Sequence, residues 1–318
     1  IASARYDTHS DYADHFTPKF AASFRVWDGL ILKASVGTGF KAPTFQQLYL
    51  DWTNSIAGYS VFGSAYFKEG YNKLKEAGVI ADEIIPVDRI KELTPEKSFS
   101  VNGGFVWDLG DRNELKINMF WNKLSDMIDV LPVATKQSGS QVFGYFNLKE
   151  VYTQGAEINF TTNFAKNFRF SAGFQYLDTY DKDVLDDIKA GNVFKRTSEG
   201  TKRVKESEYG GLWNRSKYSG NFKIDYNNNE YGLNVFVRSV VRGRYGFEDK
   251  NLSTYLDDDN EYAPGYAIFN FAATKEFLRD FQVQFGVDNI FDKMDIRYLT
   301  TNPGRTFFVN LTYKFFNN

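Results

Sequence analysis

Pro303-Gly304-Arg305-Thr306-Phe307-Phe308-Val309-Asn310-Leu311-Thr312-Tyr313-Lys314-Phe315-Phe316 is the stretch that decides the fold class of this chain. From Phe307 onward an apolar residue stands at every second position, with Asn310, Thr312 and Lys314 between them. A period of two predicts a β-strand with one apolar and one polar face. Its length, from 307 to 316, suits a tilted strand that crosses a membrane.

The composition is compatible with a membrane barrel and excludes several other classes. The 318 residues carry a net charge of −2, and the mean hydropathy is −0.44. No apolar run reaches the ~18 residues of a membrane-spanning helix, whereas polar residues facing a barrel lumen lower the average hydropathy. Aromatic residues make up 18% of the chain, as expected for interfacial girdles, and there is no cysteine for disulfide or thiol chemistry. The near-neutral charge gives no indication of nucleic-acid binding, and no catalytic set of residues stands out.

The same period-two pattern recurs along the chain and predicts about twelve strands. The first of them, at residues 1–8, is read as the tail of a strand that begins before Ile1. The other strands are expected near 18–27, 30–39, 96–109, 115–122, 141–164, 168–176, 218–226, 231–242, 269–273, 281–288 and 307–316. Gly144 and Gly155 are interpreted as bulges in the longest of them.

The connections between these strands alternate between short and long. Short turns are expected at 28–29, 110–113, 165–167, 227–229 and 278–280. Longer loops are expected at 9–17, 40–95, 134–140, 177–214, 243–264 and 292–304, the second of them with a short helix near 66–77. This alternation is typical of an antiparallel transmembrane β-barrel, with short periplasmic turns beside the C-terminus and long outward loops. The fold class is therefore all-β, with residues 1–318 as one domain and no plug domain, the C-terminal part of a larger barrel.

Four segments resemble those of the TonB-dependent outer-membrane receptors. They are Phe40-Lys41-Ala42-Pro43 within 35–49, with lysine in place of the usual arginine, Leu93-Thr94-Pro95-Glu96-Lys97-Ser98, Gly155-Ala156-Glu157, and Val287-Asp288-Asn289-Ile290-Phe291-Asp292 followed by Pro303-Gly304-Arg305-Thr306. The aromatic end of the chain also resembles the closing strand of such barrels. The resemblance implies a 22-stranded barrel in outer-membrane lipid, an N-terminal plug, energy from the TonB complex through that plug, and import of a scarce, bulky nutrient without catalysis.

The nutrient implied by the resemblance is an iron complex, haem or a siderophore, with cobalamin import as the alternative. Residues 209–216 and 242–246 resemble receptors of the Bacteroidetes type related to haem and cobalamin importers. Such receptors imply a surface lipoprotein or a haem or cobalamin carrier as a further partner. The absence of histidine from 44–93 departs from the haem receptors. Glycan or peptide import, an outer-membrane enzyme or adhesin, and a passive porin are more distant alternatives.

Candidate site residues fall in the predicted outward loops and on the polar face. Aromatic rings that could stack on a flat ligand or pack the loop are Tyr49, Trp52, Tyr59, Phe62, Tyr66, Phe67 and Tyr71. Arg238 and Arg242 should face the lumen, toward an anionic substrate or plug carboxylates. His9 and His15 are haem-ligand candidates or solvated loop residues. Asp249, Asn251, Ser253, Asp257, Asp258, Asp259 and Glu261 offer oxygen ligands for a calcium ion or form a solvated acidic loop.

Overall fold

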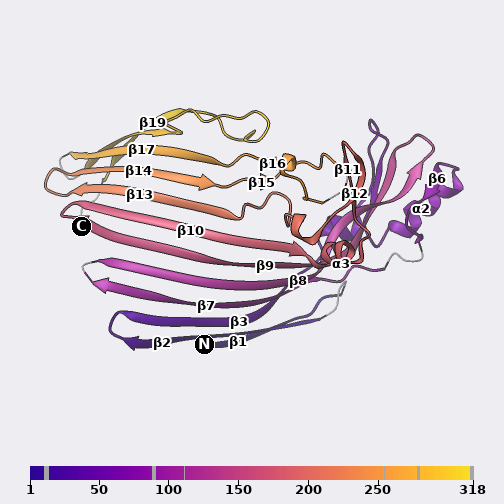
Figure 1. The fold of residues 1–318 in the computed structure, drawn as a ribbon, viewed down its shortest axis with the longest axis horizontal. Helices are drawn as coiled ribbons and strands as arrows, with labels where there is room; N and C mark the ends of the chain where they lie inside the picture. Colours follow the sequence, from indigo (N-terminus) through magenta and orange to yellow (C-terminus); the bar gives the residue numbers. More distant parts are fainter. Residues whose placement is uncertain are drawn as a thin grey trace.

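A computed structural model of the chain describes residues 1–10, 14–87, 91–110, 112–251, 253, 255–277 and 280–315, with only the backbone at 148 and 149. The predicted turns at 110–113 and 278–280 and the end of the last predicted strand therefore lie partly outside the described residues. Within these ranges, twelve antiparallel strands follow one another in chain order across one curved sheet (Figure 1). They are β1 (Ala2–Asp7), β2 (His15–Trp27), β3 (Leu30–Lys41), β7 (Glu96–Gly110), β8 (Asn113–Lys136), β9 (Gln141–Ala165), β10 (Phe168–Asp181), β13 (Tyr218–Asn228), β14 (Leu233–Arg242), β17 (Tyr266–Phe277), β18 (Phe281–Asp288) and β19 (Thr306–Tyr313). The predicted number of strands is confirmed.

The register places the apolar residues of neighbouring strands on one face of the sheet. Ile117 of β8 stands opposite Phe105 of β7 and Ile158 of β9. On the other face, Arg238 of β14 stands opposite Lys223 of β13 and Asn270 of β17. Because directly opposed residues point to the same side of a sheet, the predicted alternation is confirmed strand by strand. We call these two sides the apolar face and the polar face.

The two ends of the sheet differ in the way the strands are joined. β2 and β3, β9 and β10, and β13 and β14 are joined by short turns, and Figure 1 shows this end at the left. Tyr313 of β19 pairs with Phe281 and so ends there too. The long connections gather at the opposite end, which we call the loop end. The predicted alternation of short and long connections is confirmed.

The segment between β3 and β7 folds onto the extended tips of β8 and β9. It contains α1 (Phe45–Tyr49), β4 (Asp51–Thr53), β5 (Ser60–Phe62), α2 (Phe67–Glu76) and β6 (Ile80–Glu83). β5 pairs in parallel with β9, and β6 pairs antiparallel with β8. The helix expected near 66–77 is confirmed as α2. We call residues 42–87 with the tips of β8 and β9 the outward subdomain.

Several predicted boundaries were wrong in detail. The loop expected at 134–140 shortens to 137–140, because β5 and β6 give the tips of β8 and β9 additional partners. Tyr231 lies in the turn before β14 instead of in the strand. β19 ends at Tyr313, where its partner β18 begins.

The predicted bulges at Gly144 and Gly155 were also wrong, because the register shifts of β8 and β9 fall at 124–128 and 132–134 of β8. Each glycine instead permits a close approach. A Cβ at Gly144 would lie 2.7 Å from the ring of Phe67, and one at Gly155 would lie 2.0 Å from the carbonyl oxygen of Tyr176.

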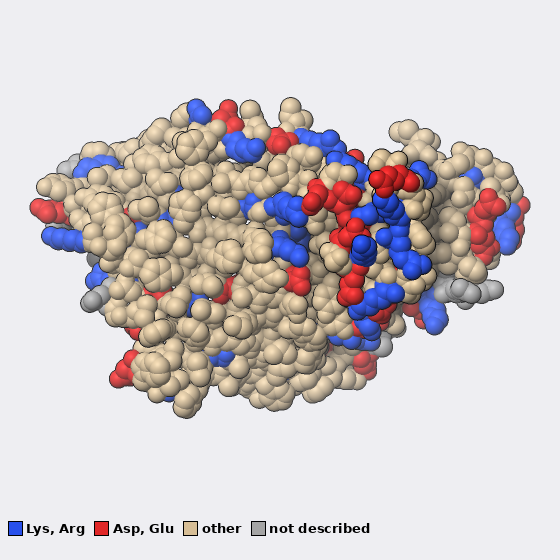
Figure 2. All heavy atoms as spheres, viewed as in Figure 1, with Lys and Arg blue, Asp and Glu red and all other residues tan. Residues whose placement is uncertain are grey.

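The remaining connections at the loop end carry small elements of their own. Between β10 and β13 lie α3 (Lys182–Ala190), β11 (Phe194–Thr197), β12 (Gly200–Arg203) and η2 (Glu206–Glu208). Between β14 and β17 lie β15 (Tyr245–Gly246), η3 (Asp259–Glu261) and β16 (Tyr262–Ala263). No helix among the described residues is long and apolar enough to cross a membrane. Figure 2 shows charged side chains concentrated near the loop end and sparse over the middle of the strands.

Candidate functional site

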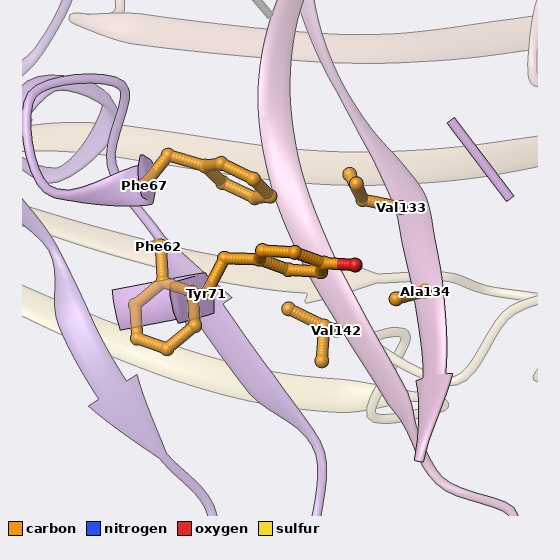
Figure 3. Close-up of a cluster of buried hydrophobic side chains, with 6 residues drawn as sticks. All are labelled: Phe62, Phe67, Tyr71, Val133, Ala134 and Val142. Atoms are coloured by element: carbon orange, nitrogen blue, oxygen red, sulfur yellow. The ribbon is translucent and has the colours of Figure 1, made fainter. Parts of the chain in front are cut away.

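Three of the aromatic candidates form the core of the outward subdomain. Phe62, Phe67 and Tyr71 are 3%, 0% and 1% exposed and pack against Val133, Ala134 and Val142 of the β8 and β9 tips (Figure 3). Burial and a hydrogen bond from the Tyr71 hydroxyl to Glu83 Oε2 (3.0 Å) raise the pKa of Tyr71 to about 12. For these three residues the packing alternative holds, because their rings are covered by protein.

The other four aromatic candidates lie nearer the surface of the subdomain. Trp52 and Tyr66 are each 43% exposed. The Trp52 ring lies 5.4 Å from Tyr59, which lies 6.0 Å from Phe143 of β9. The Tyr49 ring lies 6.1 Å from Tyr66. Contact of these rings with a substrate stays a prediction, and Phe143 is a neighbour that the loop composition alone did not identify.

The polar face carries a hollow of about 850 Å³ that spans β9, β10, β13 and β14. Its polar lining includes Glu157, Asn159, Gln175, Asn221, Arg215, Lys223, Arg238 and Arg242. The Arg242 guanidinium donates to the Asn214 carbonyl oxygen (2.8 Å) and stacks 3.9 Å above the Tyr245 ring. Lys223 pairs with Asp225.

Arg238 and Arg215 are the cations of this hollow that are open to a ligand. Among the described residues neither has a carboxylate within ion-pair distance, and both side chains are exposed. The expectation that Arg238 and Arg242 share the polar face is confirmed by the register. Four cationic side chains against the single carboxylate of Glu157 give the hollow a positive lining.

The two histidines lie at the loop end but do not come together with the aromatic candidates. His9 is exposed between β1 and β2. His15 begins β2 opposite Asp7, and its ring centroid lies 4.6 Å from that of Phe40. Within the described part of the chain, the buried Nε2 of His15 has no hydrogen-bond partner. Haem ligation by either histidine stays a prediction.

The acidic loop between β15 and β16 is held by internal hydrogen bonds. The Glu261 carboxylate accepts from the backbone N–H of Lys250, Asp257 and Asp258 at 2.9–3.3 Å. Burial raises the pKa of Glu261. Asp259 pairs with Arg244 at 2.7 Å, and Asn251 donates to Asp257 Oδ1 at 2.6 Å.

This arrangement leaves the calcium hypothesis as a prediction. Across the described residues, no group of three or more His, Asp and Glu side chains is placed to hold a metal ion. Among the described residues the buried Oδ2 of Asp257 has no hydrogen-bond partner. A calcium ion that also used Asn251, Asp259 or Glu261 would have to replace bonds described above, and the site would also include Asp249 as predicted.

Lys195 joins two of the outward connections, a contact that the sequence did not indicate. Its ammonium donates to Glu208 Oε1 and to the Asp257 carbonyl oxygen, both at 3.1 Å. Burial opposes the charge on Lys195, but Glu208 and Asp257 together raise its pKa. The segment between β10 and β13 is thereby tied to the acidic loop.

Two of the quoted sequence segments meet at the loop end. Lys41, which stands where the resemblance leads one to expect arginine, pairs with Glu96 at 2.9 Å across β3 and β7. Glu96 also accepts from the backbone N–H of Ile128 (3.0 Å). The Asn147 side chain accepts a hydrogen bond from the backbone N–H of Thr94 and donates one to the Thr94 carbonyl oxygen, both at 2.8 Å. These bonds fix the position at which the outward subdomain leaves the sheet.

A family model described as "TonB dependent receptor-like, beta-barrel" matches residues 1–290. The ferric enterobactin receptor PirA of Pseudomonas aeruginosa is 25% identical over 327 residues, covering 98% of this chain and 38% of that protein. The vitamin B12 transporter BtuB of Photobacterium profundum is 24% identical over 316 residues, covering 98% of this chain and 40% of that protein. The chain therefore spans about two fifths of the length of these curated relatives.

The solved structures that resemble this one have the same fold at lower identity. The crystal structure of the siderophore receptor PirA from Pseudomonas aeruginosa has a TM-score of 0.62 at 18% identity. It aligns with 98% of this chain and 44% of that chain. A ferric enterobactin receptor mutant from the same organism, solved with enterobactin, has a TM-score of 0.67 at 17% identity, with 98% and 42% covered. These structures establish the barrel architecture.

Proposed function

Because the chain belongs to the TonB-dependent receptor family and forms part of its outer-membrane β-barrel, we propose that the complete receptor imports an iron complex, a siderophore or haem. The complex binds the outward loops and a plug domain, and the TonB complex supplies the energy for its release into the periplasm. The barrel holds and orients the cargo, and no bond of the cargo is broken. The remaining strands, the plug and TonB are the partners that this proposal requires.

The observation that carries the choice of an iron complex is the positive hollow on the polar face, taken with the names of the relatives. A ferric complex whose deprotonated oxygen ligands carry more than three negative charges is anionic, and exposed guanidinium groups such as that of Arg238 attract it. Two relatives in Pseudomonas aeruginosa are ferric enterobactin receptors. The surface rings of Trp52 and Tyr59 suit the flat rings of an aromatic chelator.

Cobalamin is the second candidate, favoured by the similarity to the vitamin B12 transporter. The acidic loop at 249–261 is relevant to this second candidate, because a calcium ion bound at Asp257 would order the loop for cargo binding. A calcium requirement for cargo binding would favour cobalamin over an iron siderophore.

The test is equilibrium binding of ferric enterobactin, haem and cobalamin to the purified full-length receptor, with calcium or with a chelator. We expect tight binding of one iron complex, weakened at least about tenfold by Arg238→Gln, since one charge-assisted contact contributes roughly 1.5–3 kcal/mol. Lys116→Gln, on the polar face at the short-turn end, is the matched control and should bind normally. Binding of none of the three, together with binding of a glycan or peptide, would overturn the choice of cargo and leave the barrel assignment intact.

A further inference from the structure

On the apolar face, the side chains become more polar along β8, β9 and β10 toward the loop end. Met119, Ala156 and Tyr176 form one row across the three strands. Two residues further along, the next row is Trp121, Gln154 and Asp178, and Asp178 pairs with Lys217. The row after that is Lys123, Tyr152 and Tyr180. In a membrane barrel this order matches hydrocarbon, interface and headgroup, because aromatic rings collect at the interface and lysine ammoniums lie beyond them.

The aromatic rows form a continuous contact. The Trp121 ring lies 5.6 Å from Tyr152, and the Tyr152 ring stacks on Tyr180 at 4.9 Å with an interplanar angle of 12°. Phe99 of β7 extends the group, at 6.1 Å from Trp121. These rings are packed side by side, so they form a rigid base for the charged groups above them.

Two lysines and one carboxylate lie directly on this base. Lys123 Nζ lies 2.8 Å from Glu150 Oε2, and Lys182 Nζ, from the first residue of α3, lies 3.4 Å from Glu150 Oε1. The Tyr152 hydroxyl also donates to Glu150 (2.5 Å). The side chains of Lys123 and Lys182 are 34% and 49% exposed, against 24% for Glu150.

We propose that Lys123 and Lys182 bind the phosphate of a lipid headgroup in the leaflet around the loop end of the barrel. Glu150 is already the acceptor of three donors, whereas each ammonium carries three N–H groups and gives one to Glu150. The three groups together carry a net charge of about +1, with the positive groups more exposed than the negative one. A phosphate oxygen can therefore accept from both ammoniums without displacing Glu150, while the acyl chains lie along Trp121, Met119 and the apolar face below.

The occupant is a lipid because of where the lysines lie. Lys123 stands on the same face as Ile117 and Met119, away from the polar face that carries Arg238 and the hollow, and Lys182 lies beside it at the Glu150 carboxylate. A soluble anionic cargo would approach the hollow, whereas a headgroup meets the outside wall. The inference rests on the proposed orientation, with the loop end outward.

The experiment uses the purified full-length receptor in detergent and measures lipid binding by native mass spectrometry. The probes are bis-phosphorylated lipid A, its enzymatically dephosphorylated form, and inorganic phosphate as a competitor. We expect lipid A to bind the wild type, and Lys123→Ala and Lys182→Ala each to weaken it about fivefold, in line with roughly 1 kcal/mol per basic residue near a lipid surface. Dephosphorylated lipid A should bind the wild-type receptor weakly. Its affinity should not exceed the affinity of lipid A for the double variant Lys123→Ala with Lys182→Ala.

Two further variants keep the test decisive. Lys123→Arg with Lys182→Arg retains both charges and should restore binding, while Lys116→Ala, on the polar face of the same strand, should leave it unchanged. Resistance of the barrel to heat denaturation on gels shows that each variant is folded. Equal binding by the double alanine variant, equal binding of the dephosphorylated lipid, or full displacement by millimolar inorganic phosphate would overturn the lipid site.

Cargo binding separates this inference from the proposed function. A receptor that binds none of the iron complexes and still discriminates phosphorylated from dephosphorylated lipid would refute the proposed cargo alone. A wild-type receptor that binds an iron complex but does not discriminate phosphorylated from dephosphorylated lipid would refute the lipid site alone.

Discussion

Phe67 is the most completely buried aromatic side chain in the core of the outward subdomain. It is fully buried between Phe62, Tyr71 and the close approach permitted by Gly144. We expect Phe67→Ala to destabilise the subdomain by about 3–5 kcal/mol through lost contacts and a residual cavity. Phe45→Ala, at a ring that is 79% exposed, is the control and should change the stability little.

Limited proteolysis of the folded receptor measures the effect of Phe67→Ala, as the rate of cleavage within residues 42–87. Resistance of the barrel to heat denaturation on gels shows that the sheet stays folded. Faster cleavage in the Phe67 variant and unchanged cleavage in the Phe45 variant are expected. Equal protection in both variants would mean that the subdomain is held by its strand pairing with β8 and β9 and not by its core.

Tyr71 gives the subdomain a dependence on alkaline pH. Its folded pKa of about 12 lies above the ordinary value of 10.0, so the folded state retains the phenolic proton more tightly than the unfolded state. The contribution is complete below pH 10 and is lost as the pH rises from 10 through 12. In ¹³Cζ-tyrosine NMR, the resonance that disappears in Tyr71→Phe should titrate near 12. A midpoint near 10 would show that the ring is accessible to solvent.

At the scale of the element, the alternation of side chains along β8 predicts which residues face the lipid and which face the lumen. Ile117 shares the apolar face with Phe105 and Ile158, and Asn118 shares the polar face with Glu157. Ile117→Arg should lower the free energy of unfolding in lipid vesicles by roughly 2–4 kcal/mol, because arginine near the middle of the span loses its hydration. Asn118→Arg is the matched control and should cost less, since that position faces the lumen.

Urea titration of the full-length receptor in vesicles, followed by tryptophan fluorescence, measures both β8 variants. A larger cost at Asn118 than at Ile117 would mean that the apolar face is directed toward the lumen. The same result would remove the geometric basis of the headgroup site, because Lys123 lies on the face of Ile117.

At the scale of the whole molecule, the two ends of the sheet should lie on opposite sides of the outer membrane. We expect protease added to intact cells to cut within 42–87, 182–217 and 243–265, which lie at the loop end. The turns at 28–29, 165–168 and 228–233 should be cut only after the outer membrane is permeabilised. Cleavage confined to these turns in intact cells would reverse the orientation and place the Lys123 site in the inner leaflet.

The sequence by itself determined the strands, the two faces and the division of the connections into short and long. These features depend on neighbours two residues apart and on local turn residues, so a single pass along the chain reveals them. The quoted segments, such as the one around Lys41, also pointed to the family before any contact was known.

Only the tertiary structure decided which side chains of similar composition are covered and which are exposed. Phe67 and Trp52 lie in the same aromatic stretch, yet Phe67 is buried by Val133 and Val142, which come from a hairpin more than sixty residues further along. Lys123 and Lys182 are likewise brought to one carboxylate by the pairing of three strands. Burial and charge pairing depend on contacts between distant segments, and the local periodicity that predicts a strand carries no information about which distant residues will meet.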